Sequence, residues 1–270
     1  MKNALTIAGS DSCGGAGIQA DLKTFSAHGV YGMSVITAVT AQNTQEVTGV
    51  QDISAEMISK QMKAIFEDIR VDGLKIGMVS QTATIKAIAE GLGYYKPIGI
   101  VIDPVMVSKS GCHLLQPEAK AALASILLPL AAVVTPNIPE AEVLTGMKIY
   151  SVEDMKKASK KIMELGPGNV LLKGGHLDAD ATDLLYDGKD FRIFKSRRLN
   201  TKNTHGTGCT LSAAIAANMA KGYPVAAAIE RAKKYITAAI ENSLSLGKGV
   251  GPVNHFYTLY RKAGILDEQE

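Results

Sequence analysis

Residues 203–212 carry the strongest chemical signal in the sequence. The segment reads NTHGTGCTLS and leads from predicted edge strands into an alanine-rich predicted helix. Gly206 and Gly208 let backbone N–H groups converge, because no Cβ stands in their way. The helix N-terminus adds partial positive charge, so the segment suits a phosphate. An ordinary helix start with a small buried cysteine explains the local pattern equally well, because short glycine-rich motifs are common.

Cys209 lies in the first predicted turn of that helix. Its thiol could accept the proton of a substrate hydroxyl, or its N–H could stabilise a transferring phosphoryl group. The positive field of the helix N-terminus should lower the pKa of the thiol. The segment alone does not decide between these roles.

Two further segments offer groups that could recognise a substrate. Residues 8–21 read AGSDSCGGAGIQAD and follow the first predicted strand, but they fit neither GxGxxG nor a P-loop. Asp21 could hydrogen-bond a substrate hydroxyl, or it could be a solvent-facing carboxylate of the first helical turn. Gln42 ends the second predicted strand and offers an acceptor beside a donor pair, which matches the edge of an aminopyrimidine. A surface glutamine is the alternative.

Polar side chains also follow three later predicted strands. Asp103 and Glu140 could hold Mg²⁺ beside a triphosphate, because magnesium commonly uses few carboxylates and several waters. Asn137 and Lys173 could contact phosphate oxygens. Glu140 could instead be a first-turn carboxylate favoured by the helix dipole, and Lys173 could simply extend to water. Together these groups form a set suited to phosphoryl transfer, in which positioning and charge neutralisation supply most of the catalysis.

Short apolar runs alternate with segments of helical period, which predicts a three-layer αβα sandwich around a mostly parallel sheet. The runs lack polar alternation, as expected for strands that are buried on both faces. Asp187-Gly188 predicts a hairpin that adds antiparallel strands at one edge. The predicted strands are 4–8, 34–40, 74–79, 99–102, 132–135, 170–173, 183–186 and 191–194. The predicted helices are 18–27, 55–68, 82–95, 117–128, 152–165, about 208–221, 225–246 and 252–262.

Composition narrows the class of protein. The chain has 270 residues, of which 46% are hydrophobic, and we expect one domain over residues 1–270, without a linker or repeat. The net charge of +3 is scattered, so no nucleic-acid partner is expected. Three widely separated cysteines and the lack of a signal-like or membrane-spanning run predict a cytoplasmic protein with no membrane partner.

The sequence closely resembles the hydroxymethylpyrimidine/phosphomethylpyrimidine kinases, which belong to the ribokinase-like superfamily. The resemblance extends from the first residues to within about fifteen residues of the end. The matching stretches are ALTIAGSDSCGGAGIQADLKTF, YGMSVITAVTAQNT, KIGMV, DPVMVSKSG, TPNIPEAEVL, LLKGGH, KNTHGTGCTLSAAIAA and GKGVGPVNHF.

The resemblance implies an activity and a set of site residues. It implies that MgATP phosphorylates 4-amino-5-hydroxymethyl-2-methylpyrimidine and then its monophosphate in thiamine biosynthesis, within a homodimer. Gly206, Thr207, Gly208 and Cys209 match the anion hole of the family, with Cys209 as its proposed base. The implied substrate pocket comprises Gly9, Asp21, Gln42, Met78 and Val105. The implied nucleotide and magnesium contacts are Asn137, Glu140 and Lys173, beside Asp103.

Three other functions compete with this interpretation. The pyridoxine/pyridoxal kinase branch shares the AGSD, DPVM and Cys-containing segments, but it differs around Gln42, which favours a pyrimidine. A dual-specificity enzyme is also compatible, because both rings carry a hydroxymethyl group. A catalytically silent ligand-binding protein is the third candidate, and the complete phosphoryl-transfer set argues against it. Residues 108–112 and 203–208 are glycine-containing candidates for a lid.

Overall fold

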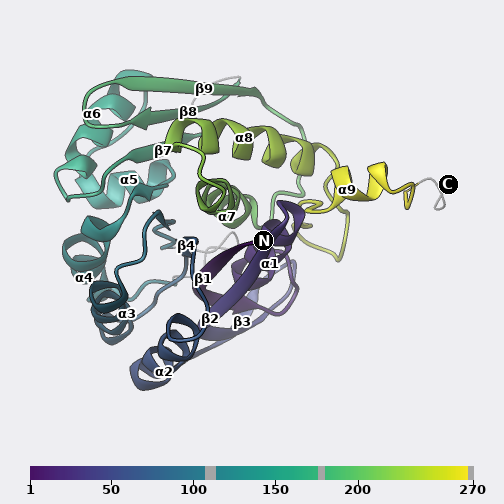
Figure 1. The fold of residues 1–270 in the computed structure, drawn as a ribbon. Coiled ribbons are helices and arrows are strands. Elements are labelled where there is room, and N and C mark those ends of the chain that lie inside the picture. The colour runs from purple at the N-terminus through teal and green to yellow at the C-terminus, as the bar shows by residue number, and fades with distance from the viewer. Residues whose placement is uncertain (107–113, 176–179, 267–270) are drawn as a thin grey trace.

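A computed structural model describes residues 1–106, 114–175 and 180–266 (Figure 1). Its strands form one sheet in the order β3-β2-β1-β4-β5-β6-β7-β8-β9. In this spatial order, all neighbouring strands from β2 through β1 and β4 to β7 pair in parallel. At one edge β3 lies antiparallel, and at the other β8 and β9 form an antiparallel hairpin. The strands are β1 Lys2–Asp11, β2 Val30–Gln42, β3 Val47–Asp52, β4 Gly73–Ile76, β5 Ile100–Ile102, β6 Val133–Val134, β7 Val170–Gly174, β8 Asp180–Tyr186 and β9 Phe191–Arg197.

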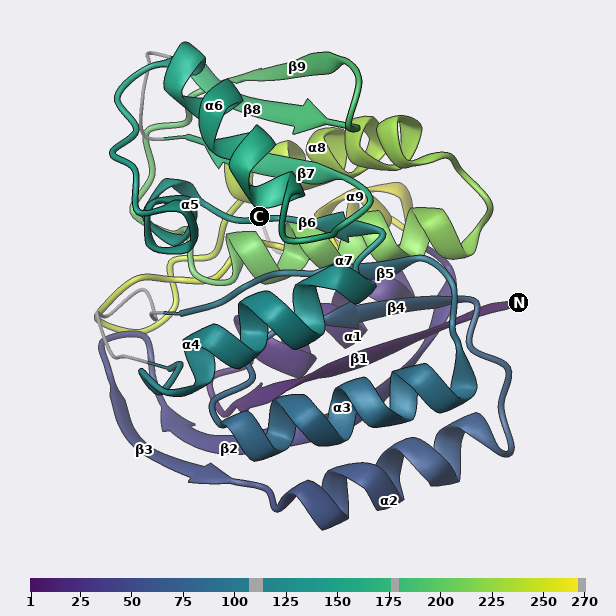
Figure 2. The ribbon, with the colours of Figure 1, turned by 90° about the vertical axis from the view of Figure 1, so that its left-hand side faces the viewer.

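Helices cover both faces of this sheet and bury a separate apolar core on each. On one face the core includes Ile58, Ile88 and Ile162, which come from α2, α3 and α6. On the other face Phe25, Ile215 and Ile229 belong to α1, α7 and α8. Figure 2 shows α2, α3 and α4 in front of the sheet. The three-layer prediction is therefore confirmed. None of the helices in the described ranges is long and apolar enough to cross a membrane.

Several predicted helices match the structure in position. Ser54 and Ser151 cap α2 and α6, and their side chains accept hydrogen bonds from the backbone N–H groups of Met57 and Asp154. Each side chain satisfies one of the N–H groups that a helix start leaves without a partner. The helices are α1 Gly17–Ala27, α2 Ala55–Phe66, α3 Thr82–Tyr95, α4 Ala119–Ala122, α5 Ile138–Thr145, α6 Val152–Met163, α7 Thr207–Ala220, α8 Val225–Glu241 and α9 Tyr257–Lys262.

Other elements differ from the prediction for identifiable reasons. The predicted helix 117–128 divides into α4, a π-helical turn at Leu123–Leu127 and a 3₁₀ turn at Leu128–Leu130, because Pro129 cannot continue an α-helix. The edge strand β3 was not predicted, since its exposed VTGVQD sequence contains no buried apolar run. Residues 252–256 are not helical: Pro252 forms an isolated bridge with His205.

The topology brings the candidate site residues to one edge of the sheet. Parallel strands point their carboxyl ends in the same direction, so the segments that follow them meet there. Asp103 comes directly after β5, Asn137 follows β6, and Lys173 lies near the end of β7. The N-termini of α1, α5 and α7 approach the same edge, where their partial positive charges favour anions.

The cores on the two faces should carry most of the stability. Ile88 is completely buried in α3, whereas Ile98 is 77% exposed in the turn after it. We expect Ile88→Ala to lower the free energy of unfolding by about 2–5 kcal/mol, because it leaves a cavity. Ile98→Ala should change it by less than about 0.5 kcal/mol. Urea denaturation of both variants measures the difference, and equal losses would contradict this description of the core.

Candidate active site

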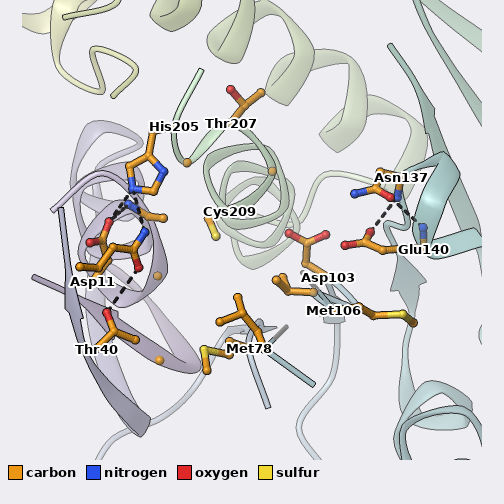
Figure 3. A pocket seen from close by; sticks show the side chains of 18 of the residues that line it. Asp11, Thr40, Met78, Asp103, Met106, Asn137, Glu140, His205, Thr207 and Cys209 are labelled. Carbon is orange, nitrogen blue, oxygen red and sulfur yellow. Dashed lines mark hydrogen bonds and ion pairs between the residues drawn. The ribbon is translucent and has the colours of Figure 1, made fainter. Parts of the chain in front are cut away.

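A cavity of about 460 Å³ opens at the carboxyl edge of the sheet. Figure 3 shows Asp11, Thr40 and His205 on one wall, Asp103, Asn137 and Glu140 on the opposite wall, and Cys209 between them. The cavity therefore gathers segments from both halves of the chain. The sequence-predicted residues that line it are Gly9, Gln42, Met78, Asp103, Val105, Asn137, Glu140, Lys173, Gly206, Thr207, Gly208 and Cys209.

The N-terminus of α7 forms one end of the cavity. Gly206 is its N-cap, with a left-handed φ of 78°, and the first helical hydrogen bond joins the Thr210 N–H to the Gly206 carbonyl. The N–H groups of Gly208 and Cys209 precede that bond, so they are available to an anion. A Cβ on Gly206 would lie 1.7 Å from the carbonyl oxygen of Gly15, so only glycine fits. The geometry supports the predicted phosphate cradle.

The thiol of Cys209 corrects one expectation. Burial raises its pKa to about 11; the ammonium of Lys75 and the N–H of Gly17 oppose this increase, and the carboxylates of Asp21 and Asp103 add to it. The positive field of the helix N-terminus was expected to lower this pKa, but it is outweighed. The thiol is therefore neutral around pH 7–8.

Asp21 lies beneath the cavity rather than in its wall. Its side chain is completely buried, where it accepts hydrogen bonds from Thr6 at 2.6 Å and from Lys75 at 2.8 Å. Burial raises the pKa of Asp21, and Lys75 and Thr6 oppose this increase; burial alone would lower the pKa of Lys75, but the Asp21 carboxylate raises it above the ordinary value. We describe the two groups as an ion pair because of their 2.8 Å contact. The expected direct contact of Asp21 with a substrate hydroxyl does not fit this position, because Asp21 is fully buried outside the cavity lining, whereas its partner Lys75 lines the cavity.

Lys75 was not singled out from the sequence. It is a charged residue in the strand LKI, whose neighbours are all buried. A lysine is almost never fully buried without a partner, so its position was a usable signal of a polar site. Its ammonium places one positive charge at the floor of the cavity.

The wall opposite Asp11 concentrates charge around Asp103. One of its carboxylate oxygens accepts hydrogen bonds from Lys173 at 2.8 Å and from Thr135 at 3.0 Å. Burial would raise the pKa of Asp103, but Lys173 and Lys75 lower it, so the carboxylate is ionised.

Asn137 and Glu140 form a capping box at the start of α5, with two reciprocal hydrogen bonds of 2.8 Å. An asparagine followed three residues later by glutamate is a sequence signal for this helix, which was not among the predicted helices although Glu140 was considered as a first-turn carboxylate.

Glu140 carries a perturbed carboxyl group. Burial raises its pKa to about 7; Lys173 opposes the increase and the nearby Asp103 carboxylate adds to it. Asp103 and Glu140 are therefore neighbouring carboxyl groups with too little positive charge around them to balance two negative charges. A bound divalent cation would reduce the repulsion between them. Their oxygen donors are also the type that Mg²⁺ prefers. Asp103 and Glu140 thus fit the predicted magnesium site.

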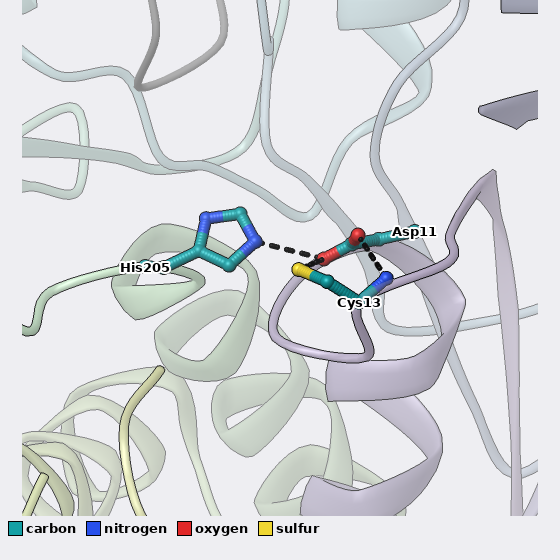
Figure 4. A group of neighbouring side chains, drawn as sticks. All are labelled: Asp11, Cys13 and His205. Carbon is teal, nitrogen blue, oxygen red and sulfur yellow. Dashed lines mark hydrogen bonds and ion pairs between the residues drawn. The ribbon is translucent and has the colours of Figure 1, made fainter. Parts of the chain in front are cut away.

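A second cluster, Asp11, Cys13 and His205, was not identified from the sequence (Figure 4). One ligand atom from each lies within 4.8 Å of the others, so the cluster could in principle hold a metal ion. However, the Asp11 carboxylate already accepts hydrogen bonds from the backbone N–H groups of Cys13, Gly15 and Ala16 and contacts His205 at 2.8 Å. A metal ion would have to displace these contacts, so the cluster fits a structural role better.

The remaining predicted substrate positions form an apolar slot. A Cβ on Gly9 would lie 2.9 Å from the sulfur of Met78, so the strand and the methionine are in close contact there. Val105 lines the same cavity. This arrangement suits a flat ring.

Of the two predicted lid candidates, residues 108–112 lie outside the described residues, and residues 203–208 lead into α7.

The fold and the site together define an α/β kinase, and comparison with known proteins specifies the family. Residues 11–254 match the family model of phosphomethylpyrimidine kinase. A hydroxymethylpyrimidine/phosphomethylpyrimidine kinase of Rhizobium meliloti is 56% identical over 96% of this chain and 98% of its own length. The corresponding protein of Bacillus subtilis is 48% identical over 95% of each chain. The chain therefore belongs to the phosphomethylpyrimidine kinase family, which confirms the resemblance.

Solved structures extend the comparison to a neighbouring activity. The phosphomethylpyrimidine kinase of Clostridium difficile has a TM-score of 0.80 and 53% identity, covering 89% of this chain and all of its own. A Bacillus subtilis pyridoxal kinase, solved with ADP, has a TM-score of 0.90 and 44% identity, covering 96% of this chain and 99% of its own. Fold similarity alone thus does not separate the two ring substrates.

Because Gly206 lies so close to Gly15, a side chain at position 206 should affect activity as well as stability. Gly206 and Gly188 both have positive φ angles, of 78° and 91°, but a Cβ on Gly188 would meet nothing within 4 Å. We expect each alanine substitution to cost about 1–2 kcal/mol of stability from left-handed strain. Only Gly206→Ala should also lower kcat/KM, by roughly 100-fold, because it displaces the cradle. Steady-state kinetics decides, and equal activities would show that the contact is unimportant.

The pKa of Cys209 can be measured directly. The difference in thiolate absorbance between the wild type and Cys209→Ser should show a transition near pH 11. Because the folded-state pKa lies above its ordinary value of 9.0, the thiol stabilises the folded protein below pH 9, and this contribution disappears between pH 9 and 11. Cys209→Ser should therefore alter the pH dependence of stability in that window. A transition below pH 9 would instead support the lowered pKa that the field of the helix N-terminus predicts.

Proposed function

We propose that this kinase transfers the γ-phosphoryl group of ATP to the hydroxymethyl oxygen of 4-amino-5-hydroxymethyl-2-methylpyrimidine. It then phosphorylates the monophosphate to the diphosphate, in thiamine biosynthesis. The observation that carries this proposal is one cavity that combines Gln42, the N-terminus of α7 and the charged wall around Asp103. The names of the relatives support the same substrate.

In the proposed reaction the substrate oxygen attacks the γ-phosphorus and ADP leaves. The N–H groups of Gly208 and Cys209, with Thr207 beside them, bind the transferring phosphoryl group at the helix N-terminus. Lys173 and Asn137 contact the phosphates. The hydroxyl proton passes to Cys209 when its thiolate is present, or to a substrate phosphoryl oxygen when it is not. Positioning and charge neutralisation are expected to dominate over acid–base chemistry.

Gln42 is proposed to hydrogen-bond the edge of the pyrimidine ring, and Gly9, Met78 and Val105 are proposed to form the apolar slot around it. Its amide can donate to a ring nitrogen and accept from the exocyclic amine next to it. Magnesium is proposed to bind at Asp103 and Glu140, where it would neutralise phosphate charge. Asp21 contributes through Lys75, whose ammonium lies at the floor of the cavity.

Pyridoxal phosphorylation is a second candidate, favoured by the close structural similarity to the Bacillus subtilis pyridoxal kinase. Both rings carry a hydroxymethyl group, so one site could serve both. We rank the pyrimidine first because Gln42 lines the cavity and matches an aminopyrimidine edge. A single domain over residues 1–270, a homodimer and a cytoplasmic location remain proposals that rest on the sequence and its family resemblance.

The substrate proposal is tested by incubating the protein with MgATP and either ring and identifying products by mass spectrometry. We expect ADP with the mono- and diphosphate of the pyrimidine, and no product when EDTA removes the metal. kcat/KM should favour the pyrimidine. A tenfold or greater preference for pyridoxal would reverse the ranking, and the absence of any product with either ring would favour a binding protein without activity.

A further inference from the structure

Asp11 is surrounded almost entirely by hydrogen-bond donors. The N–H groups of Cys13, Gly15 and Ala16 lie 2.9, 3.1 and 2.7 Å from its carboxylate oxygens. Burial would raise its pKa, but the hydrogen bonds from His205, Cys13 and Ala16 outweigh this effect and lower the pKa to about 2. The carboxylate is therefore ionised, and every partner around it must supply a hydrogen.

This requirement determines the tautomer of His205. Its Nε2 lies 2.8 Å from an Asp11 carboxylate oxygen. An unprotonated nitrogen there would place a lone pair against a negative charge, so Nε2 carries a hydrogen and donates it. The His205 ring is buried and packs against the Gly15 backbone, where a Cβ would lie 2.3 Å from its Cδ2, so close packing opposes rotation of the ring.

The protonated Nε2 in turn determines the orientation of the Gln42 amide. As placed, the Gln42 amide has its Nε2 3.5 Å from His205 Nε2 and its Oε1 3.4 Å from Thr40 Oγ1, which sets two N–H donors against each other. Thr40 already donates its single hydrogen to the Ser10 carbonyl at 2.8 Å, so it can only accept from Gln42. Both contacts are satisfied when the amide oxygen faces His205 and the NH₂ group faces Thr40. The oxygen then shares the Nε2 hydrogen at longer range than Asp11 does.

The backbone of Gln42 is fixed to the same assembly. The hydroxyl of Ser12 donates to the Gln42 carbonyl at 2.6 Å and accepts from the Gln42 N–H at 2.8 Å. The amide can therefore change its orientation only by rotating about its own side-chain bonds. The contact with His205 is one of two that oppose this rotation.

From these contacts we propose that the Asp11–His205 pair fixes the Gln42 amide and thereby selects an aminopyrimidine over a pyridine ring. His205 is the positioning residue in this arrangement. The inference rests on the proposed role of Gln42 in ring binding. With the oxygen held toward His205, the amide accepts from the exocyclic amine and donates to the ring nitrogen beside it. That order admits the ring in one orientation, so its hydroxymethyl group points in one direction.

Pyridoxal cannot use a fixed amide in the same way. No amine is attached beside its ring nitrogen, so the amide oxygen would lack the hydrogen bond that the pyrimidine amine donates and would keep only its long contact with His205. An unpaired polar group in a buried site weakens binding. If the amide could rotate freely, it would adapt to either ring and the preference would fall.

The test compares ring binding by the wild type, His205→Phe and His205→Gln, using calorimetry without ATP. His205→Phe keeps a ring of similar size but removes the donor, whereas His205→Gln restores an N–H near Asp11. We expect His205→Phe to raise the Kd for the pyrimidine about tenfold, which corresponds to about 1.4 kcal/mol, and to change the Kd for pyridoxal less than about twofold. His205→Gln should recover most of the preference. His28→Phe is the matched control, since His28 is a half-buried histidine at the far end of α1.

Kinetics separates positioning from a general structural defect. For His205→Phe we expect KM for the pyrimidine to rise while kcat and KM for ATP stay within about threefold of the wild type. Equal weakening for both rings, weakened ATP binding, or an unchanged preference would overturn the inference. If His205→Phe does not fold, Thr40→Val removes the other contact of the amide and should also relax the preference; an unchanged ratio in that variant overturns the inference.

The wild type distinguishes this inference from the proposed function. Tight binding of the pyrimidine without phosphorylation would refute the proposed reaction, while the ring preference of the variants would still decide the role of His205. If the wild type does not bind the pyrimidine at all, both proposals fall. If the wild type phosphorylates the pyrimidine and His205→Phe keeps the same ring preference, only the inference about His205 is refuted.

Discussion

The close approach of Gly206 to the carbonyl of Gly15 connects two parts of the chain that the rest of the site requires together. It joins the loop after β1 to the N-terminus of α7, with no space for a side chain between them. This approach brings Asp11 within 2.8 Å of His205 and opens the N–H groups of α7 toward the cavity. The cavity wall that carries Asp11 and His205 and the N-terminus of α7 therefore share one support.

A second constraint is the placement of charge beneath and beside the cavity. Lys75 and Lys173 pair with Asp21 and Asp103 at 2.8 Å each. Breaking a buried pair by removing one partner leaves an uncompensated charge, which is strongly destabilising. Glu140 lies beside these two pairs, and burial raises its pKa to about 7; Lys173 opposes the increase and the Asp103 carboxylate adds to it. The unbalanced carboxyl group is where a cation and phosphates would change the electrostatics most.

Much of this site could be predicted from the sequence because it follows from topology. Asp103 and Lys173 occur at the ends of apolar runs, and parallel strands end at the same edge of the sheet. The pairing of Asp11 with His205 could not be predicted, since 194 residues separate them and tertiary packing, including the Gly15–Gly206 contact, brings them together. The exposed strand β3 has no apolar pattern to reveal it. The burial of Asp21 and the raised pKa of Cys209 likewise depend on packing that no local pattern encodes.

The chemistry of Cys209 is best understood from its surroundings. With a pKa of about 11, the fraction of thiolate near pH 7.5 is on the order of 10⁻³ to 10⁻⁴. A thiolate would also add negative charge near Asp21 and Asp103, both of which raise its pKa. Phosphoryl transfer through a loose transition state demands little from a base, because the attacking oxygen loses its proton late. A neutral residue at this position therefore costs the reaction little, while it leaves the two N–H groups of the helix N-terminus undisturbed. In the proposed reaction the backbone of residues 206–209 therefore has the larger part, and the part of the thiol depends on pH.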